Sequence, residues 1–301
     1  MKKVEIKGII PPIITPMDED ERINVPVLRQ QVERQLENGV HALFCFGTNG
    51  EGYILSATEK QLILETVVAQ VCGRVPVYAG TGCISTRETI EQSKMAQNAG
   101  ADVLSIITPS FAAASQNELY AHYAAVAEAV DMPIVLYNIP ARTGNALQPT
   151  TVGKLAKNYE NIVGAKDSSG SFDNILQYIE QTRDLGTFSV LSGNDSLILW
   201  TLLAGGTGGI AGCANVYPRT MASIYDCFVA GDIKKAREYQ DSIRSFRGCF
   251  KYGNPNTVVK KAVALLGYNV GECRAPFNQL PEEGVEALKK VLQENASKGV
   301  H

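Results

Sequence analysis

The chain has 301 residues, of which 45% are hydrophobic, and a formal net charge of -3. This composition provides for a large buried core and excludes disordered, collagen-like and fibrous proteins. The small negative charge and the lack of a basic tract argue against nucleic-acid binding. We therefore expect the partner to be a small molecule.

No segment reaches about 18 consecutive apolar residues, so we expect no membrane span and no membrane partner. The first six residues lack the apolar segment of a signal peptide, and we expect a cytoplasmic protein. The seven cysteines contain no Cys-x-x-Cys pair and predict reduced thiols. The three histidines are His41, His122 and His301, too few for a histidine-ligated metal or a Ser-His-Asp triad. We expect no metal and no cofactor.

From the N-terminus almost to residue 212, short β-branched runs alternate with longer segments of helical periodicity. This alternation is typical of repeated βα units. Eight parallel strands predict an α/β fold, a (β/α)8 TIM barrel. The expected strands are residues 8–15, 42–46, 75–79, 103–107, 134–137, 162–166, 188–191 and 209–211.

Helices are expected between the strands, and several end at a glycine typical of a C-cap, as in residues 25–37, 58–71 and 86–98. Residues 58–61 and 85–88 each have a hydroxyl residue followed three positions later by Gln or Glu, a capping-box pattern. After the eighth strand only helices are expected, at residues 218–230, 233–250, 257–266 and 282–296. We therefore divide the chain into a barrel at 1–217 and a C-terminal helical extension at 218–301.

The run at residues 162–166 ends in a lysine, Lys166. In one interpretation this lysine buries its stem at the strand edge and keeps its charge in water. In the other it is a desolvated, partly neutral amine that attacks a carbonyl carbon. Reactive groups of α/β barrels lie at the C-terminal ends of the strands, so the other strand ends decide between the two.

Four further polar stretches follow strands, at residues 47–51, 108–111, 137–144 and 192–195. A Schiff-base enzyme needs an amine, a proton shuttle and donors for the carboxylate of a 2-oxo acid. Lys166 offers the amine and Tyr137 the shuttle. The successive N–H groups of residues 47–50 form an anion-binding turn, and Arg142 can hold a second carboxylate or a hydroxylated chain. Each of these features also has an ordinary interpretation: residues 47–50 as a simple turn, Tyr137 as a packed side chain, and Arg142 as a member of a surface ion pair.

Four motifs resemble the dihydrodipicolinate synthase / N-acetylneuraminate lyase family: GTNGE at 47–51, YNIPARTG at 137–144, GAKDSSG at 164–170 and GGTGGIAG at 205–212. They occur in the family's order and spacing through nearly the whole chain. The resemblance implies a (β/α)8 barrel, usually a homotetramer built as a dimer of dimers. It also implies a Schiff base between pyruvate, or another 2-oxo acid, and Lys166, with Tyr137 as acid/base and Thr48 as its proton relay.

The resemblance further implies that Gly47, Thr48 and Asn49, with the backbone of Gly193 and Ile210, line the 2-oxo acid. The chain departs from the family pattern in two places, at Asn49 and at the pair Ser110 and Phe111. Asn49 replaces a hydroxyl residue.

Ser110 and Phe111 replace a tyrosine pair whose second member extends the relay from the neighbouring subunit. Phe111 has no hydroxyl, so we expect a shortened relay or a phenyl wall for a bulkier substrate.

The leading expectation is a class I aldolase-type lyase that condenses or cleaves pyruvate with an aldehyde. Arg142 favours synthase activity. The resemblance implies that an arginine at this position binds the carboxylate of the aldehyde substrate in synthases. The Lys-Asp-Ser-Ser-Gly motif favours an aldolase or dehydratase of 2-keto-3-deoxy sugar acids or hydroxy-2-oxo acids. A 2-oxo-acid-binding protein without turnover stays open as an alternative from another class.

Overall fold

The computed structural model describes residues 4–301. Its backbone contacts divide the chain into two compact units. Unit 1 contains residues 4–8 and Pro76–Ile210, and unit 2 contains Ile9–Val75 and Ala211–His301. Strand β1 (Gly8–Ile10) carries the boundary between them.

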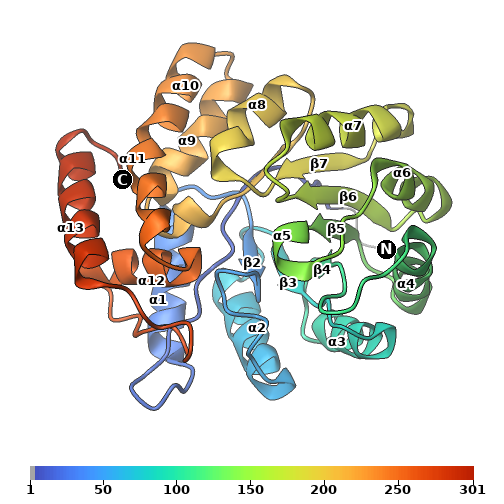
Figure 1. Cartoon of the computed structure of the whole chain (residues 1–301), viewed down its shortest axis with the longest axis horizontal. Helices are drawn as coiled ribbons and strands as arrows, with labels where there is room; N and C mark the ends of the chain where they lie inside the picture. The colour runs from blue at the N-terminus through green and yellow to red at the C-terminus, as the bar shows by residue number, and fades with distance from the viewer. Residues whose placement is uncertain (1–3) are drawn as a thin grey trace. The chain divides into compact units, whose positions relative to one another are not determined.

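Unit 1 is a series of strand–helix repeats. Strands β3 to β8 pair in parallel, each with the next in sequence. Helices α3, α4, α6 and α7 lie outside strands β4 to β7, and consecutive helices contact one another (Figure 1). The strands are β3 (Val77–Gly80), β4 (Val103–Ile107), β5 (Ile134–Asn138), β6 (Ile162–Asp167), β7 (Ser189–Ser192) and β8 (Gly208–Ile210). The helices are α3 (Thr86–Asn98), α4 (Gln116–Ala129), α5 (Pro140–Thr143), α6 (Pro149–Asn158), α7 (Phe172–Thr182) and α8 (Ile198–Leu203), with short 3-10 turns η1 (Arg183–Leu185) and η2 (Asp195–Leu197).

The core of unit 1 lies on these strands. All five residues of β5 are buried, and so are four of the five in β4. Strand β4 is aliphatic except for Ser105, and β5 begins with three aliphatic residues, as expected for parallel strands covered on both faces. Because the strands are buried and mainly apolar, the polar residues available for chemistry lie at the strand ends.

Unit 2 is mainly helical. Helix α1 packs on α2, α9 on α10, and α12 on α13. Its elements are α1 (Val25–Glu37), β2 (Leu43–Cys45), α2 (Ala57–Val71), η3 (Gly212–Asn215), α9 (Pro218–Val229), α10 (Ile233–Ser242), α11 (Arg244–Gly248), η4 (Cys249–Tyr252), α12 (Pro255–Leu265) and α13 (Glu282–Ser297).

The strand order is β1-β8-β7-β6-β5-β4-β3-β2, so sequence neighbours are sheet neighbours, as in a (β/α)8 barrel. All eight expected strands are present, but the extents of the first strand and of one helix differ from the prediction. The first strand ends at Ile10 rather than at residue 15, because Pro11 and Pro12 have no N–H to donate. The helix expected at 233–250 is broken into α10, α11 and η4. Ser242 Oγ donates to the Tyr239 carbonyl at 2.8 Å, a back-bond that bends helices.

The capping box expected at residues 58–61 is wrong. Helix α2 begins one residue earlier, and its box joins Ser56 to Glu59. At residues 85–88 one half of the expected box is confirmed, since the Ser85 side chain accepts from Glu88 N. The other three helices expected after residue 218 are present as α9, α12 and α13, whereas the domain division at 217/218 stays a prediction.

No helix within residues 4–301 is both long and apolar enough to cross a membrane. All seven cysteines are free thiols.

Candidate active site

Lys166 and Tyr137 lie opposite each other on adjacent strands, since the register of β5 and β6 pairs these two residues. Both are buried, at 4% and 3% exposure. The Lys166 Nζ atom lies over the tyrosine ring, 3.7 Å from its centroid. The interpretation of a strand-edge lysine with its charge in water is therefore wrong, and the expected meeting of amine and tyrosine is confirmed.

Asp167, the next residue, points to the opposite face of β6, as strand alternation requires. Its carboxylate accepts from Asn138 Nδ2 at 2.8 Å and from Ser169 N at 3.0 Å, and also from Asn174. Asn138 in turn accepts from Leu147 N at 2.9 Å. These bonds fix the end of β6, so the backbone that carries Lys166 is rigid.

Gly193 lies against the lysine side chain. Its N–H donates to the Asp167 carbonyl at 2.6 Å. A Cβ atom at this position would lie 2.8 Å from Lys166 Cε and 1.8 Å from Ser168 Oγ, so only glycine fits. Gly193 thus lies beside the Lys166 side chain, while the expected role of its backbone in lining the 2-oxo acid stays a prediction.

The Ser168 hydroxyl is buried and has no hydrogen-bond partner in the part of the chain that the structure describes. Leaving such a group unpaired costs about 1–3 kcal/mol. It borders the same Gly193 as the Lys166 side chain does. Sequence reasoning did not single out Ser168, because a Ser-Ser-Gly run is typical of an ordinary turn.

Phe111 stands at the tip of the loop after β4. It is 99% exposed and has a left-handed backbone, φ +78°, which is strained for a bulky residue. Asn145 holds this loop, accepting from Ala114 N and donating to the carbonyls of Pro109 and Ala112, each at 2.8 Å. The phenyl ring therefore projects from a loop that the hydrogen bonds of Asn145 hold in place.

Arg142 lies on the short helix α5 and is exposed, and Ile210 ends β8 at 2% exposure. The two residues follow strands, as expected. Their substrate roles stay predictions.

In unit 2, residues 47–51 form a tight turn in which Gly50 N donates to Gly47 O at 3.0 Å and Glu51 N to Thr48 O at 3.1 Å. A Cβ atom at Gly47 would lie 2.9 Å from the Phe44 ring, and one at Gly50 would lie 2.7 Å from a backbone oxygen. The glycines are therefore required by close packing. Thr48 and Asn49 are half-buried at the turn's tip.

Glu51 is fully buried and pairs with Lys260 of α12, with 2.8 Å between Oε1 and Nζ. Its other oxygen accepts from Arg274 N at 2.8 Å. Sequence reasoning placed Lys260 in a helix and gave Glu51 no partner. More than 200 residues separate the pair, so no local spacing connects them.

The model of the Dihydrodipicolinate synthetase family matches residues 5–295. The chain belongs to this family. It is 42% identical over 291 residues to the 4-hydroxy-tetrahydrodipicolinate synthase of Methanopyrus kandleri, covering 96% of each chain.

Solved structures of the family match just as fully. YagE, a prophage protein of the dihydrodipicolinic acid synthase family from E. coli K12 solved in complex with pyruvate, has a TM-score of 0.93 at 34% identity, covering 96% of this chain and 98% of its own. The chloride-inhibited dihydrodipicolinate synthase of Acinetobacter baumannii, complexed with pyruvate, has a TM-score of 0.93 at 33% identity, with 98% and 100% covered. The protein is a lyase of this aldolase-type family and has its (β/α)8 TIM-barrel fold.

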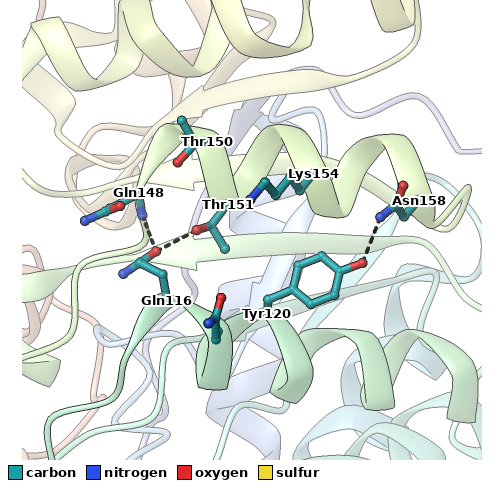
Figure 2. A pocket seen from close by; sticks show the side chains of 8 residues that line it. Gln116, Tyr120, Gln148, Thr150, Thr151, Lys154 and Asn158 are labelled. Atoms are coloured by element: carbon teal, nitrogen blue, oxygen red, sulfur yellow. Dashed lines mark hydrogen bonds between the residues drawn. The ribbon is translucent and has the colours of Figure 1, made fainter.

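This family member also has a polar pocket of about 390 Å³ on helices α4 and α6 (Figure 2). Gln116 Oε1 accepts there from Gln148 N at 3.0 Å and Thr151 Oγ1 at 2.8 Å. None of the predicted site residues lines it. It does contain Lys154, so a lysine-labelling experiment has to distinguish Lys154 from Lys166.

Within residues 4–301 no group of three or more His, Cys, Asp or Glu side chains could hold a metal ion.

Proposed function

We propose that this lyase forms a Schiff base between Lys166 and pyruvate, and condenses the adduct with an aldehyde or cleaves the reverse product. The observation that carries the proposal is the buried Lys166 amine lying 3.7 Å from the centroid of the Tyr137 ring. The pyruvate in the two solved relatives supports the choice of 2-oxo acid. The best single activity is that of 4-hydroxy-tetrahydrodipicolinate synthase, the name carried by the 42% identical relative.

In the proposed reaction the Lys166 amine attacks the keto carbon of pyruvate, and Tyr137 moves a proton to the carbinolamine oxygen, which leaves as water. The resulting imine nitrogen is the electron sink. The pyruvate methyl group then loses a proton and attacks the aldehyde carbon. Hydrolysis of the imine returns the free lysine, so the cycle needs neither a metal nor another cofactor.

The roles of the other residues are proposed on the family resemblance. Thr48 relays the proton of Tyr137. Gly47 and Asn49, with the backbone of Gly193 and Ile210, bind the carboxylate end of pyruvate.

Arg142 holds the carboxylate of the aldehyde, which a planar guanidinium binds in bidentate fashion. Its exposed position on α5 is compatible with a partner that arrives second.

A second candidate is cleavage of a 2-keto-3-deoxy sugar acid. The unpaired, buried hydroxyl of Ser168 favours it, because a substrate hydroxyl would satisfy that group. Phe111 also favours this candidate, because its phenyl ring has no hydroxyl and cannot act as the relay tyrosine.

The test is a screen in which pyruvate is constant and the aldehyde varies between aspartate semialdehyde and hydroxylated aldehydes, in both reaction directions. We expect turnover with one of these classes and a pyruvate adduct trapped by borohydride. An adduct without turnover of any aldehyde would favour the binding protein instead, and no adduct at all would contradict the proposal. Exhaustive chelation should leave the rate unchanged.

We also propose a cytoplasmic homotetramer. Seven free thiols suit a reducing compartment, and the fully exposed Phe111 on an ordered loop suits an interface between copies. Sedimentation analysis should give four times the 32.5 kDa chain mass, and a monomer at micromolar concentration would contradict this.

A further inference from the structure

The backbone carbonyl of Thr48 accepts two hydrogen bonds in unit 2. One comes from Glu51 N within the turn at 3.1 Å, and the other from the Asn256 side chain at 2.7 Å. Asn256 is 1% exposed and belongs to the first turn of α12, which Asn254 caps. Its amide also donates to the Tyr53 hydroxyl at 3.1 Å. A residue of the C-terminal helices thus holds the tip of the turn.

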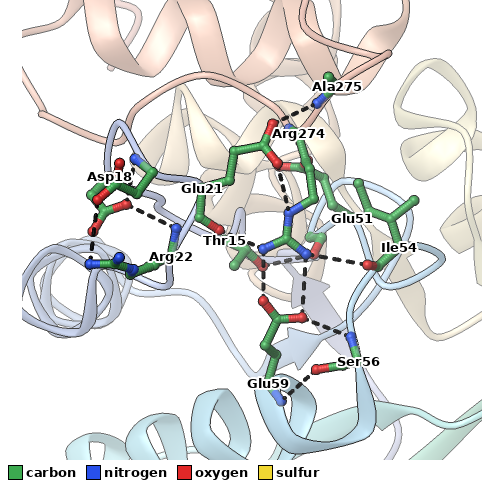
Figure 3. A network of polar contacts seen from close by, with 12 residues as sticks. Thr15, Asp18, Glu21, Arg22, Glu51, Ile54, Ser56, Glu59, Arg274 and Ala275 are labelled. Atoms are coloured by element: carbon green, nitrogen blue, oxygen red, sulfur yellow. Dashed lines mark hydrogen bonds and ion pairs between the residues drawn. The ribbon is translucent and has the colours of Figure 1, made fainter.

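The other end of the turn is held from the same part of the chain. Glu51 is tied to Lys260 and to the backbone of Arg274. Figure 3 shows the Arg274 guanidinium between Glu59 and the Ile54 carbonyl, where it bonds at 2.7 Å and 3.3 Å. The segment that follows the turn is therefore fixed as well.

The turn needs this support because its backbone is strained. Phe46 and Glu51, on either side of the glycines, both adopt the left-handed region, with φ of +62° and +57°. Such conformations cost about 1–3 kcal/mol each and persist only where the surrounding structure imposes them. Hydrogen bonds from Asn256 and Lys260 of α12 hold the turn in this conformation.

We propose that Asn256 is a positioning residue for the reaction, which holds the Thr48 hydroxyl in place through the Thr48 carbonyl. The inference rests on the proposed relay role of Thr48. It makes the C-terminal helices part of the catalytic machinery rather than only a packed extension. A displacement on the order of 1 Å at a relay group is enough to slow a reaction strongly.

The test is a double-mutant cycle between Asn256→Leu and Thr48→Val, read as the rate of borohydride-trapped pyruvate adduct formation in the full-length protein. Alone, Asn256→Leu should slow adduct formation about tenfold while the KM for pyruvate stays within about twofold. In the Thr48→Val background the same substitution should change the rate less than about twofold. Asn256→Ala is run in parallel, so that a folding failure of one variant leaves the cycle measurable.

Tyr53→Phe is the matched control, since it removes the second partner of the Asn256 amide and leaves the bond to Thr48. It should not change the rate. If Thr48→Val itself has no effect, the relay role and the positioning role fail together. If Thr48→Val slows the reaction but Asn256→Leu has no effect, or the same effect in both backgrounds, the positioning role alone is overturned.

Discussion

Two lysines are buried to nearly the same extent in this chain, Lys166 at 4% and Lys260 at 1% exposure, and their ammonium groups have different surroundings. Lys260 is hydrogen-bonded to the Glu51 carboxylate at 2.8 Å. Lys166 lies over the ring of Tyr137, beside a glycine that leaves room for its stem. Burial alone therefore does not mark a reactive lysine. The neighbours differ: an ion pair with Glu51 favours a structural role for Lys260, and the contact with Tyr137 supports the proposed chemical role of Lys166.

The largest effect that would test this assignment is the loss of the Lys166 amine. Lys166→Ala should lower turnover by at least ~10⁴-fold, because no imine forms without the nucleophile. Thermal unfolding of the same variant shows whether the fold is intact. Turnover within tenfold of the unmodified protein would remove Lys166 from the mechanism.

The second prediction concerns Lys260. Lys260→Met should lower the free energy of unfolding by about 3–5 kcal/mol, because it leaves the Glu51 carboxylate buried without its partner. The double variant with Glu51→Gln should recover part of this loss, since no charge is then buried. Chemical denaturation measures both. A loss below about 1 kcal/mol for Lys260→Met would contradict the structural assignment.

The third prediction concerns Phe111, which bears on chemistry and not on stability. Because residues 112–114 are all alanine and leave space for a bulky partner, we expect Phe111→Tyr to slow turnover of the real substrate. The melting temperature should change little, since the substitution keeps the ring and adds a single hydroxyl group. A tenfold gain in synthase activity, with no sugar-acid cleavage by either form, would show instead that the phenyl ring only interrupts a relay.

The smallest expected effect is at Glu59, which supports the segment after the Glu51 turn. The hydrogen bond from Arg274 lowers the pKa of Glu59 from 4.5 to about 2. The stabilisation is therefore complete above pH 4.5 and is lost as the pH falls toward 2. Glu59→Gln should lower the melting temperature by about 2 °C at pH 7 and by nothing near pH 2.

Glu33 provides the matched control. Hydrogen bonding to Arg74 lowers its pKa to about 2 as well, but it lies on helix α1. Glu33→Gln should show the same pH dependence of stability without any change in turnover. Equal melting temperatures of Glu59→Gln and the unmodified protein at every pH would contradict the Glu59 prediction.

Local patterns in the sequence were sufficient for the eight strands, for most helix bounds and for the meeting of Lys166 with Tyr137. Strand periodicity and the order of the units carry this information directly. The sequence predicts too long a first strand, because residues 8–15 are mostly apolar and this pattern continues through the two prolines. The sequence predicts one unbroken helix at 233–250, because a hydrogen bond from a single serine side chain to the helix backbone does not change the helical periodicity of the sequence.

The contacts that the sequence does not predict join residues that lie far apart in the chain. Glu51 with Lys260, and Thr48 with Asn256, join residues more than 200 positions apart, and only the fold brings them together. The free hydroxyl of Ser168 was missed for a related reason. Whether a hydroxyl has a partner depends on its neighbours in space and not on its motif.

The most direct test of the central claim is to incubate the protein with pyruvate and borohydride and to map the modified lysine by peptide mass spectrometry. We predict one reduced pyruvyl group per chain, on the peptide that contains Lys166, and none on that peptide in Lys166→Ala. Stoichiometric labelling of Lys260, of Lys154 in the α4–α6 pocket, or of any other lysine would contradict it.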